Sequence, residues 1–259
     1  MQSRKPFLSL VIPAHNEEGS IAGTIEAITA RFAAEAFDDY EILVVDDGST
    51  DGTARSLEEL EARLPRLRHV YNPPPNGFGL AVRCGLANYR GAAVCIVMAD
   101  LSDSPDDIWR YCERLRAGAE CVFGSRFMRG SRVIDYPVHK LVLNRLANAF
   151  IRILFGLRFN DITNAFKGYR REVIDGLHPL LSRHFNLTVE LPLKAIVRGY
   201  RFEELPISWR NRKSGTSKLR IREMGSRYLF IVLYVLIEKW LSRGDYHRVN
   251  SRPSAAGSP

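Results

Sequence analysis

Apolar segments of strand length alternate with amphipathic segments of helix length over the first 125 residues, and this alternation restricts the possible folds more than any other feature of the chain. Five segments are predicted as strands, at residues 8–12, 41–45, 67–71, 92–98 and 120–124. Four segments between them are predicted as helices, at residues 17–32, 53–63, 76–89 and 106–117. Strict alternation of strands and helices favours an α/β fold with a mainly parallel sheet flanked by helices.

The alternation ends after residue 125, and longer helices dominate the rest of the chain. Helices are predicted at 137–157, 187–197 and 222–241, with a strand at 202–209 and a polar loop at 211–219. The first and last of these helices are amphipathic and basic, which suits a helix packed on the sheet and equally a helix lying at a membrane surface. The apolar run at 228–237 is too short to span a bilayer, which takes about 20 residues.

The composition indicates a globular protein and gives one hint about its partners. Of the 259 residues 46% are hydrophobic, enough for a buried core, and the net charge is +8. A basic chain can bind nucleic acid, an anionic membrane or phosphorylated substrates, but no nucleic-acid-binding motif accompanies the charge. The four cysteines lack the spacing of metal ligands and are predicted to be reduced thiols in a cytosolic chain without a signal peptide.

Carboxylates follow three of the predicted strands. Glu17 comes after the first strand, Asp46 and Asp47 after the second, and Asp100 and Asp103 after the fourth. Because the carboxyl ends of parallel strands meet at one edge, where such folds bind ligands, these groups are expected to gather there around Mg²⁺ or Mn²⁺. Any single Asp is more typical of a helix cap or a turn, so it is the repetition that favours a site.

Six motifs, in this order, give the chain a specific resemblance: VIPAHNEE, ILVVDDGSTDGT, MADLSDSP, GSRF, NDITNAFKGYRREV and NRKSGTSKL. Together they resemble the family-2 glycosyltransferases of the GT-A fold, and within them the dolichol- or polyprenol-phosphate mannose synthases. The similarity covers residues 6–245. It implies one GT-A domain at 1–245, made of a nucleotide-sugar-binding half at 6–125, an acceptor half at 126–221 and a C-terminal, membrane-associated helix at 222–245. Residues 246–259 are predicted to be a disordered tail.

The resemblance implies which residues bind the nucleotide-sugar donor. In the N-terminal half these are Pro13, His15 (usually Tyr), Asn16, Glu17, Asp46, Asp47 and Gly79. A second basic loop, which closes over the donor phosphates in the family, contributes Arg212, Ser217 and Lys218. The GxG spacing at Gly79 is equally typical of a tight strand-to-helix turn.

The metal site departs from the family pattern at one position. Asp100 matches the second Asp of the Asp-Ala-Asp motif and is the expected metal ligand, with Ser102 nearby where Gln is common. Met98 replaces the first Asp of that motif, and a thioether does not bind a hard divalent ion. The expected metal site therefore has fewer protein ligands than is usual in the family. A non-catalytic, nucleotide-binding pseudoenzyme stays open as an alternative.

The acceptor residues implied by the resemblance surround the GSR motif. Ser125 and Arg126, with Arg129 and Arg132 in the following loop, are expected to hold a lipid phosphate, because Arg suits phosphate oxygens. Arg129 and Arg132 are equally typical of solvated surface charges. Asp161 matches an Asp near the acceptor, where it orients the sugar or Arg126. The catalytic residues expected are Asp100, Arg126, Asp161, Arg212 and Lys218.

These expectations describe an inverting, metal-dependent enzyme that transfers mannose from GDP-mannose to a polyprenyl or dolichyl phosphate. The enzyme is expected to be a cytoplasmic protein that lies peripherally on the inner face of the membrane. Nucleic acid is not an expected partner. Two alternatives stay open besides the pseudoenzyme. The same fold could use UDP-glucose or UDP-GlcNAc as donor, or a saccharide as acceptor.

Overall fold

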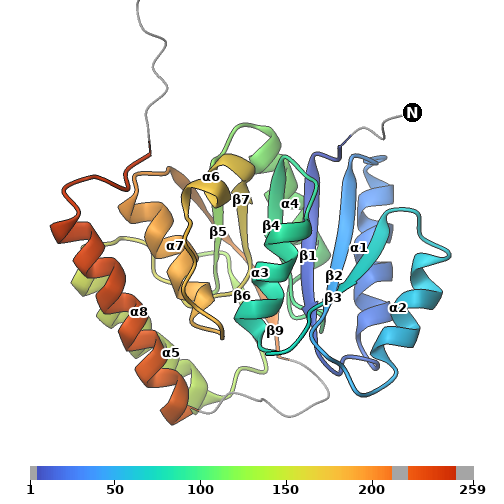
Figure 1. Cartoon of the computed structure of the whole chain (residues 1–259), viewed down its shortest axis with the longest axis horizontal. Helices are drawn as coiled ribbons and strands as arrows, with labels where there is room; N and C mark the ends of the chain where they lie inside the picture. The colour runs from blue at the N-terminus through green and yellow to red at the C-terminus, as the bar shows by residue number, and fades with distance from the viewer. Residues whose placement is uncertain (1–4, 212–220, 249–259) are drawn as a thin grey trace, which may run out of the picture.

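A seven-stranded mixed sheet with helices on both faces forms the body of the protein (Figure 1). The structure, a computed structural model, describes residues 5–211 and 221–248, with the backbone alone at 221–224. The strand order is β3-β2-β1-β4-β7-β5-β8, and only β7 runs against its two neighbours. The predicted α/β architecture with a mainly parallel sheet is thus confirmed.

The first half of the chain alternates strands and helices as the sequence predicts. The strands are β1 (Leu8–Ala14), β2 (Tyr40–Asp46), β3 (Leu67–Tyr71), β4 (Ala93–Ile96) and β5 (Cys121–Ser125). The helices are α1 (Ile21–Ala34), α2 (Thr53–Glu61), α3 (Phe78–Asn88) and α4 (Pro105–Arg116). One boundary matters for function, because α1 begins at residue 21 and not at 17, which leaves residues 15–20 as a loop at the sheet edge.

The second half differs from its prediction at two places. The predicted strand at 202–209 is two strands, β8 (Phe202–Pro206) in the main sheet and β9 (Ser208–Arg210), which pairs with β6 (Arg132–Ile134) in a small second sheet. The short strand β7 (Lys167–Arg170) was not predicted, yet it lies between β4 and β5. Its four residues include Lys and Arg, so no apolar run marked it.

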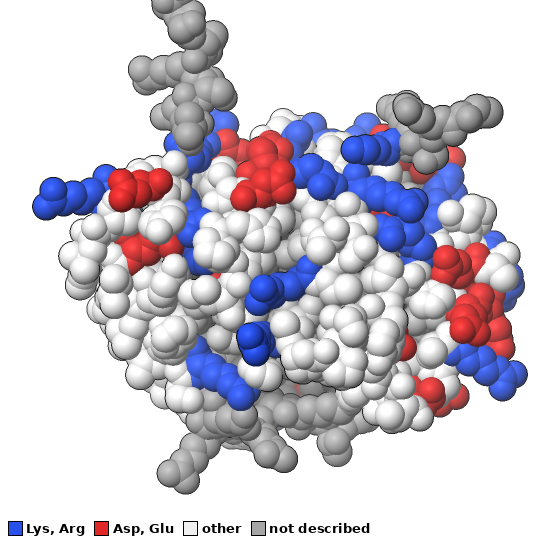
Figure 2. All heavy atoms as spheres, in the orientation of Figure 1, with Lys and Arg blue, Asp and Glu red and all other residues white. Residues whose placement is uncertain are grey.

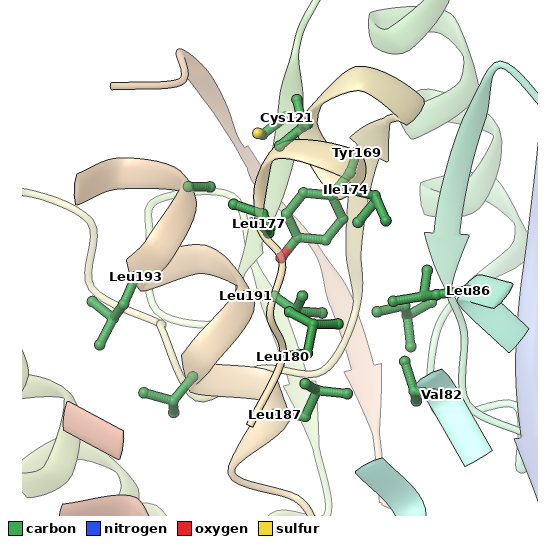
Figure 3. Close-up of a cluster of buried hydrophobic side chains, with 14 of the residues drawn as sticks. Val82, Leu86, Cys121, Tyr169, Ile174, Leu177, Leu180, Leu187, Leu191 and Leu193 are labelled. Atoms are coloured by element: carbon green, nitrogen blue, oxygen red, sulfur yellow. The ribbon is translucent and has the colours of Figure 1, made fainter. Parts of the chain in front are cut away.

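Two apolar cores cover the two faces of the sheet. Alternation along β1 sends Leu8, Leu10 and Ile12 to the core under α1, α2 and α4, and Val11 to the opposite core. The second core packs the sheet against α3, α6 (Arg171–Gly176) and α7 (Leu187–Val197), the last with the predicted bounds. Leucines of α7 and residues of α3 meet around Tyr169 in this core (Figure 3).

The helices α5 (Val138–Phe155) and α8 (Ile221–Leu241) lie together at one end of the molecule, far from α1 and α2 (Figure 1). Buried charges attach α8 to α7: Arg198 donates to Glu238 at 2.7 and 2.9 Å, and both side chains are at most 4% exposed. Beyond α8, Arg248 N donates to Arg198 O, so the described chain still packs on the domain past residue 245.

Both helices expose apolar side chains on their outer face. On α5 these are Val138, Val142, Leu143, Leu146, Phe150 and Ile153, and on α8 they are Leu229, Phe230, Leu233, Ile237, Trp240 and Leu241. We call these residues the apolar helix face. The lower left of Figure 2, where α8 lies, is accordingly mainly white. Within the described chain, none of the helices has the length and hydropathy needed to cross a bilayer.

Candidate functional site: the carboxyl edge of the sheet

The loops after β1 and β2 are fastened to each other by hydrogen bonds. Asn16 N donates to Ser49 Oγ at 3.0 Å, and Thr50 N donates to Asn16 Oδ1 at 2.7 Å. Gly52 N donates to Glu18 Oε2 at 3.1 Å. Asn16 has φ of 56°, a left-handed conformation that Asn tolerates better than most residues. We call residues 15–18 and 46–53 the interlocked loops.

The interlocked loops also hold the other predicted donor residues of this region. Glu17 N donates to Thr53 Oγ1 at 2.8 Å, and His15 Nδ1 lies 2.9 Å from Asp47 O. Since a carbonyl can only accept, His15 carries its proton on Nδ1 in this contact. Pro13 is buried in β1 just before the loop. The structure therefore brings Pro13, His15, Asn16 and Glu17 together beside Asp46, and their role in binding a nucleoside stays a prediction.

Asp46 and Asp47 have different surroundings although they are adjacent. Asp47 Oδ1 accepts from Asn72 Nδ2 at 2.6 Å and from Asn76 Nδ2 at 3.3 Å, and Asp47 Oδ2 accepts from Gly77 N at 2.9 Å. At 5% exposure it fastens the loop before α3 and is turned away from solvent. Asp46 accepts from Ser49 N at 2.9 Å through Oδ1. Asp46 is as buried as Asp47, at 6% exposure, so the two differ in their hydrogen-bond partners and not in their exposure.

The expectation that Asp46, Asp47 and Asp100 gather around one ion is wrong in this structure. Strand β1 lies between β2 and β4, so Asp46 and the loop that carries Asp100 follow strands that are not neighbours in the sheet. Among the described residues no group of three or more His, Cys, Asp or Glu is placed to hold a metal. The carboxylates after β2 and β4 therefore do not form one group of metal ligands among the described residues.

At the end of β4, Asp103 turns away from the edge. Its Oδ2 accepts from Met98 N at 3.0 Å, and the residue is 3% exposed. Burial, with the charge of Asp100 adding to it, raises the pKa of the Asp103 carboxyl to about 7. Asp100 is half-buried, and its Oδ1 accepts from Ser102 N at 3.1 Å. Asp100 is thus the one carboxylate of this loop that is presented outward.

The glycines before and within α3 have a packing reason to be glycine. A Cβ on Gly79 would lie 2.6 Å from backbone atoms of Arg183 and His184. Gly77 has φ of 153°, and a Cβ there would lie 3.0 Å from Arg183 O. Leu80 N donates to the same carbonyl at 3.2 Å. Close contact with the segment before α7 therefore explains Gly79, which was predicted at the donor.

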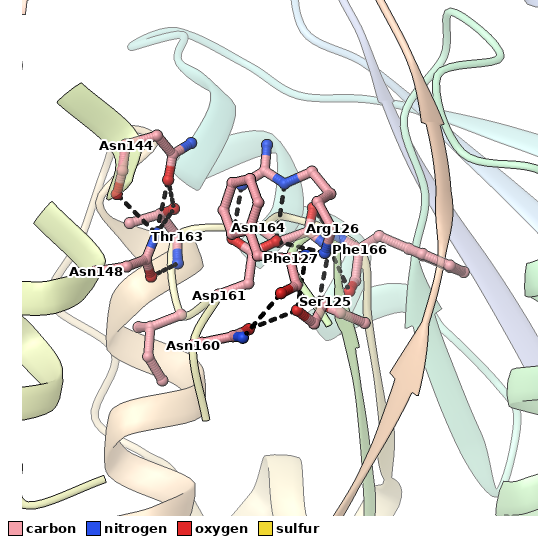
Figure 4. A network of polar contacts seen from close by, with 12 residues as sticks. Ser125, Arg126, Phe127, Asn144, Asn148, Asn160, Asp161, Thr163, Asn164 and Phe166 are labelled. Carbon is pink, nitrogen blue, oxygen red and sulfur yellow. Dashed lines mark hydrogen bonds and ion pairs between the residues drawn. The ribbon is translucent and has the colours of Figure 1, made fainter. Parts of the chain in front are cut away.

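At the end of β5, Arg126 forms a buried ion pair with Asp161 (Figure 4). Arg126 Nε and Nη2 donate to the two carboxylate oxygens at 2.8 and 2.7 Å, and Arg126 N donates to Oδ2 at 2.9 Å. Asp161 is 0% exposed and Arg126 8%. Burial opposes the charge of Arg126, but Asp161 more than offsets this and holds the pKa of the guanidinium above its ordinary value.

Aromatic rings enclose the same guanidinium. The Arg126 Cζ lies 5.3 Å from the ring centre of Phe127, 5.6 Å from that of Tyr136 and 5.9 Å from that of Trp209. Arg145, on α5, also lies over the Phe127 ring, with its Cζ 4.9 Å from the ring centre. Cations over aromatic faces are stabilised by about 0.5–2 kcal/mol each. We call Arg126, Asp161 and these rings the arginine pocket.

A second layer of polar residues supports the pocket and was not predicted. Tyr136 OH accepts from Asn144 Nδ2 at 2.7 Å, and Thr163 Oγ1 donates to Asn144 Oδ1 at 2.6 Å. Asn148 Nδ2 donates to Thr163 Oγ1 at 2.9 Å, so α5 is fixed to the segment that carries Asp161 (Figure 4). Their spacing in the sequence, 136 to 163, gave no signal because the contacts cross from a helix to a loop.

Lys167 is the other residue that sequence reasoning missed. It is 1% exposed on β7, and its Nζ donates to Ile162 O at 2.9 Å and to Asn164 O. Burial lowers the pKa of Lys167 to about 7, and the charge of Arg126 lowers it further while Asp161 raises it. A lysine between Phe and Gly in the segment NAFKGY was the available signal.

The remaining predicted acceptor residues differ in burial. Ser125 is fully buried, and its Oγ donates to Asn160 Oδ1 at 2.5 Å, so it holds the loop and does not face solvent. Arg129 and Arg132 are exposed, and among the described residues neither forms an ion pair. Arg212, Ser217 and Lys218 lie outside the described residues.

Two known enzymes are similar to this chain over most of its length. The chain is 33% identical over 216 residues to the polyprenol monophosphomannose synthase of Mycolicibacterium smegmatis, a match covering 81% of this chain and 80% of that protein. It is 27% identical over 235 residues to the undecaprenyl-phosphate mannosyltransferase of Micrococcus luteus, covering 89% of this chain and 94% of that protein.

Solved structures agree on the fold. Glucosyl-3-phosphoglycerate synthase from Mycobacterium tuberculosis, in complex with Mn²⁺, UDP-glucose and phosphoglyceric acid, superposes with a TM-score of 0.68 over 90% of this chain and 79% of that chain, at 19% identity. The predicted GT-A fold is thereby confirmed. The family model for glycosyl transferase family 2 matches residues 9–177, from β1 to the end of α6. The chain therefore belongs to glycosyl transferase family 2.

Proposed function

We propose that the protein transfers mannose from GDP-mannose to a polyprenyl phosphate, with inversion at the anomeric carbon, at the cytoplasmic face of a membrane. The names of two relatives that match most of their own length, a polyprenol monophosphomannose synthase and an undecaprenyl-phosphate mannosyltransferase, support this acceptor class. The interlocked loops, with Asp46 beside them, are the part of the edge proposed to bind the nucleoside.

The observation that carries the proposal is that Asp161 is unavailable as a base. It is fully buried and both of its oxygens accept from Arg126, so it cannot take a proton from an acceptor hydroxyl without breaking the pair. A sugar hydroxyl needs such a base. A phosphomonoester has a second pKa near 6 and is largely dianionic at neutral pH, so it attacks without one. The locked carboxylate therefore favours a phosphate acceptor over a saccharide.

Basic groups around the arginine pocket suit a phosphate. Arg129, in the loop that follows Arg126, and Arg132, the first residue of β6, are exposed, and Arg145 lies over the Phe127 ring. Arg126 itself, enclosed and paired, has a fixed direction and offers its remaining N–H groups. We propose that Arg126 orients the acceptor phosphate while the exposed arginines attract it.

The apolar helix face is proposed to lie on the membrane that holds the acceptor lipid. Ile153 is 84% exposed and Trp240 64%, so without a membrane these side chains would leave a large apolar area in contact with water. Basic residues of the same helices, Lys140 and Arg152 on α5 and Lys239 on α8, suit anionic headgroups. The face starts at Val138, two residues after Tyr136 of the arginine pocket, so a lipid lying on α5 would bring its phosphate to Arg126.

A divalent ion would be held by Asp100 together with the diphosphate of the donor. Asp100 is the outward carboxylate of its loop and has the hard oxygen ligands that Mg²⁺ and Mn²⁺ prefer. When bound, the ion would neutralise the departing nucleoside diphosphate. The residues of the chain would orient the two substrates and keep water away, and Arg212 and Lys218 are proposed to close over the phosphates.

A donor screen tests the proposal. The full chain is incubated with polyprenyl phosphate in vesicles, Mn²⁺ and GDP-mannose, UDP-glucose or UDP-GlcNAc, and lipid-linked sugar is measured. We expect transfer from GDP-mannose, none to polyprenol without the phosphate, and loss of transfer in Asp100→Ala. No transfer from any of the three donors would overturn the proposed function.

Vesicle flotation tests the membrane contact separately. Ile153→Glu and Trp240→Glu should each lower the fraction of protein that floats with anionic vesicles. Tyr71→Glu is the matched control, because Tyr71 is 57% exposed at the opposite end of the sheet order from the helices. An equal loss in the control, or no loss in the two helix variants, would contradict the proposed contact.

A further inference from the structure

Strand β9 has backbone partners on both of its edges. On one edge it pairs in parallel with β6, in the register that places Trp209 opposite Val133. On the other edge Trp209 forms an antiparallel bridge with Asp103, and Arg210 N donates to Ser102 O at 3.2 Å. β9 therefore joins the loop after β4 to the segment that follows β5.

A buried carboxylate of α4 fixes β9 on the side of the loop after β4. Ser208 N donates to Asp107 Oδ2 at 2.6 Å, and Asp107 is 4% exposed. The other oxygen of this carboxylate accepts from Arg110 Nη1 at 2.9 Å. Because α4 begins at Pro105, directly after that loop, a shift of β9 would disturb both the loop and the start of the helix.

The side chain of Trp209 extends the same connection to the arginine pocket. Its ring centre lies 5.9 Å from Arg126 Cζ and 4.8 Å from the ring centre of Tyr136. The Tyr136 ring centre in turn lies 5.6 Å from Arg126 Cζ, and Trp209 is partly buried. One residue therefore contacts the loop after β4 through its backbone and the guanidinium of Arg126 through its ring.

We infer that Trp209 is a positioning residue, which fixes the donor side of the sheet edge relative to the acceptor side. In the proposed transfer an oxygen of the acceptor phosphate forms a bond to the anomeric carbon, while the bond from that carbon to the nucleoside diphosphate breaks and the diphosphate leaves with the electron pair. The two reacting atoms must come within about 3–3.5 Å, and a misplacement of about 1 Å can slow such a step about 100-fold. The inference rests on the proposed function, which assigns the donor phosphates to the loop after β4 and the acceptor to Arg126.

Steady-state kinetics with GDP-mannose and polyprenyl phosphate in vesicles tests this role. Trp209→Ala should lower kcat by about 10- to 100-fold and change the KM of either substrate by less than about threefold, because each side keeps its own contacts with its substrate. Trp209→Phe keeps a ring and should retain kcat to within about threefold. A raised acceptor KM at unchanged kcat in Trp209→Ala, or an equal loss of kcat in Trp209→Phe, would overturn the inference.

Phe127→Ala is the matched variant on the acceptor side. The Phe127 ring centre lies 5.3 Å from Arg126 Cζ, but Phe127 lies in the loop after β5 and not on β9. This substitution should therefore raise the acceptor KM more than it lowers kcat. Trp209→Leu keeps apolar volume at position 209 without a ring, so it should show the loss of kcat even if Trp209→Ala does not fold. Equal effects of Phe127→Ala and Trp209→Leu on kcat and on the acceptor KM would contradict the role of Trp209.

Hydrogen exchange followed by mass spectrometry tests the connection without measuring activity. Residues 99–104, after β4, and residues 126–136, after β5, should both exchange at least about threefold faster in Trp209→Leu than in wild type. In Phe127→Ala the faster exchange should be confined to 126–136, and α2 should exchange equally in all three proteins. Unchanged exchange at 99–104 in Trp209→Leu would refute the connection.

The inference and the proposed function fail in different ways. If the wild-type chain transfers no sugar from any donor, the proposed function fails, while the exchange rates still decide whether Trp209 connects the two loops. If the wild type transfers mannose and Trp209→Leu has the same kcat, the proposed function stands and the inference is refuted.

Discussion

The interlocked loops and the arginine pocket, the proposed nucleoside and acceptor sides of the sheet edge, are built on opposite physical principles. The interlocked loops are joined by bonds between backbone N–H groups and polar side chains, most of them partly exposed to water. The arginine pocket is joined by a charge pair excluded from water and enclosed by rings. Weak contacts can be lost one at a time at a small cost in stability. A buried charge that loses its partner stays uncompensated, and this costs far more. The two regions should therefore respond very differently to single substitutions.

Asp161→Ala should have the largest effect. It leaves the Arg126 guanidinium buried without its counter-charge, which costs about 3–5 kcal/mol in the free energy of unfolding. Glu59→Ala is the matched control, since it breaks the Arg55–Glu59 pair, whose side chains are 84% and 61% exposed. The control should cost at most about 1 kcal/mol. Denaturant unfolding measures the change in the free energy of unfolding for both variants. Equal losses would mean that water screens the Arg126–Asp161 pair far more than its burial indicates.

Gly79→Ala should cost about 1–3 kcal/mol, because its Cβ would lie 2.6 Å from the backbone of Arg183 and His184. Gly225→Ala is the control, also in a helix, with nothing within 4 Å of the added Cβ. That change should be neutral or stabilise by up to about 1 kcal/mol, through helix propensity. Thermal unfolding of the two variants compares them directly. A loss at Gly79 no larger than at Gly225 would contradict the close packing of α3 against residues 183–184.

Lys167→Met should change how stability depends on pH. Burial lowers the folded-state pKa of Lys167 to about 7, while the unfolded chain keeps it near 10.5. Between these values the unfolded state binds more protons, so this lysine makes the protein gain stability as pH rises from 7 to 10, by up to about 1.4 kcal/mol per pH unit. Denaturant unfolding at several pH values should show a smaller slope in Lys167→Met than in wild type. Identical slopes would mean that Lys167 stays charged when folded.

Asn16→Ala should have the smallest effect, about 1 kcal/mol. It removes the acceptor for Thr50 N and places Ala in a left-handed conformation. Asn16→Gly removes the same bond but fits the backbone, so it should cost less, and the difference measures the conformational part. A loss of 3 kcal/mol or more in Asn16→Ala would show that the interlocked loops are as cooperative as the arginine pocket.

The same contrast explains what the sequence could predict. Strands β1 to β5 and the helices between them were predicted from hydrophobic periodicity, and the residues proposed to bind the nucleoside from contiguous motifs. The arginine pocket joins residues 126, 136, 161 and 209, which only the folded chain brings together, so the roles of Tyr136 and Trp209 had no local signal. The inward turn of Asp103 depends on its hydrogen bond with Met98 N, and the separation of β2 from β4 by β1 depends on strand order, neither of which composition reveals.

The interlocked loops have a consequence for how this protein can vary. Asn16 and Glu18 each serve a partner in the loop after β2, and Asp51 in turn accepts from Glu18 N and Thr53. A substitution in one loop removes half of a bond whose other half lies more than 30 positions away in the sequence. Tolerated changes at 16–18 should therefore occur together with changes at 49–53. A pairwise mutational scan of the two loops would reveal this dependence as epistasis.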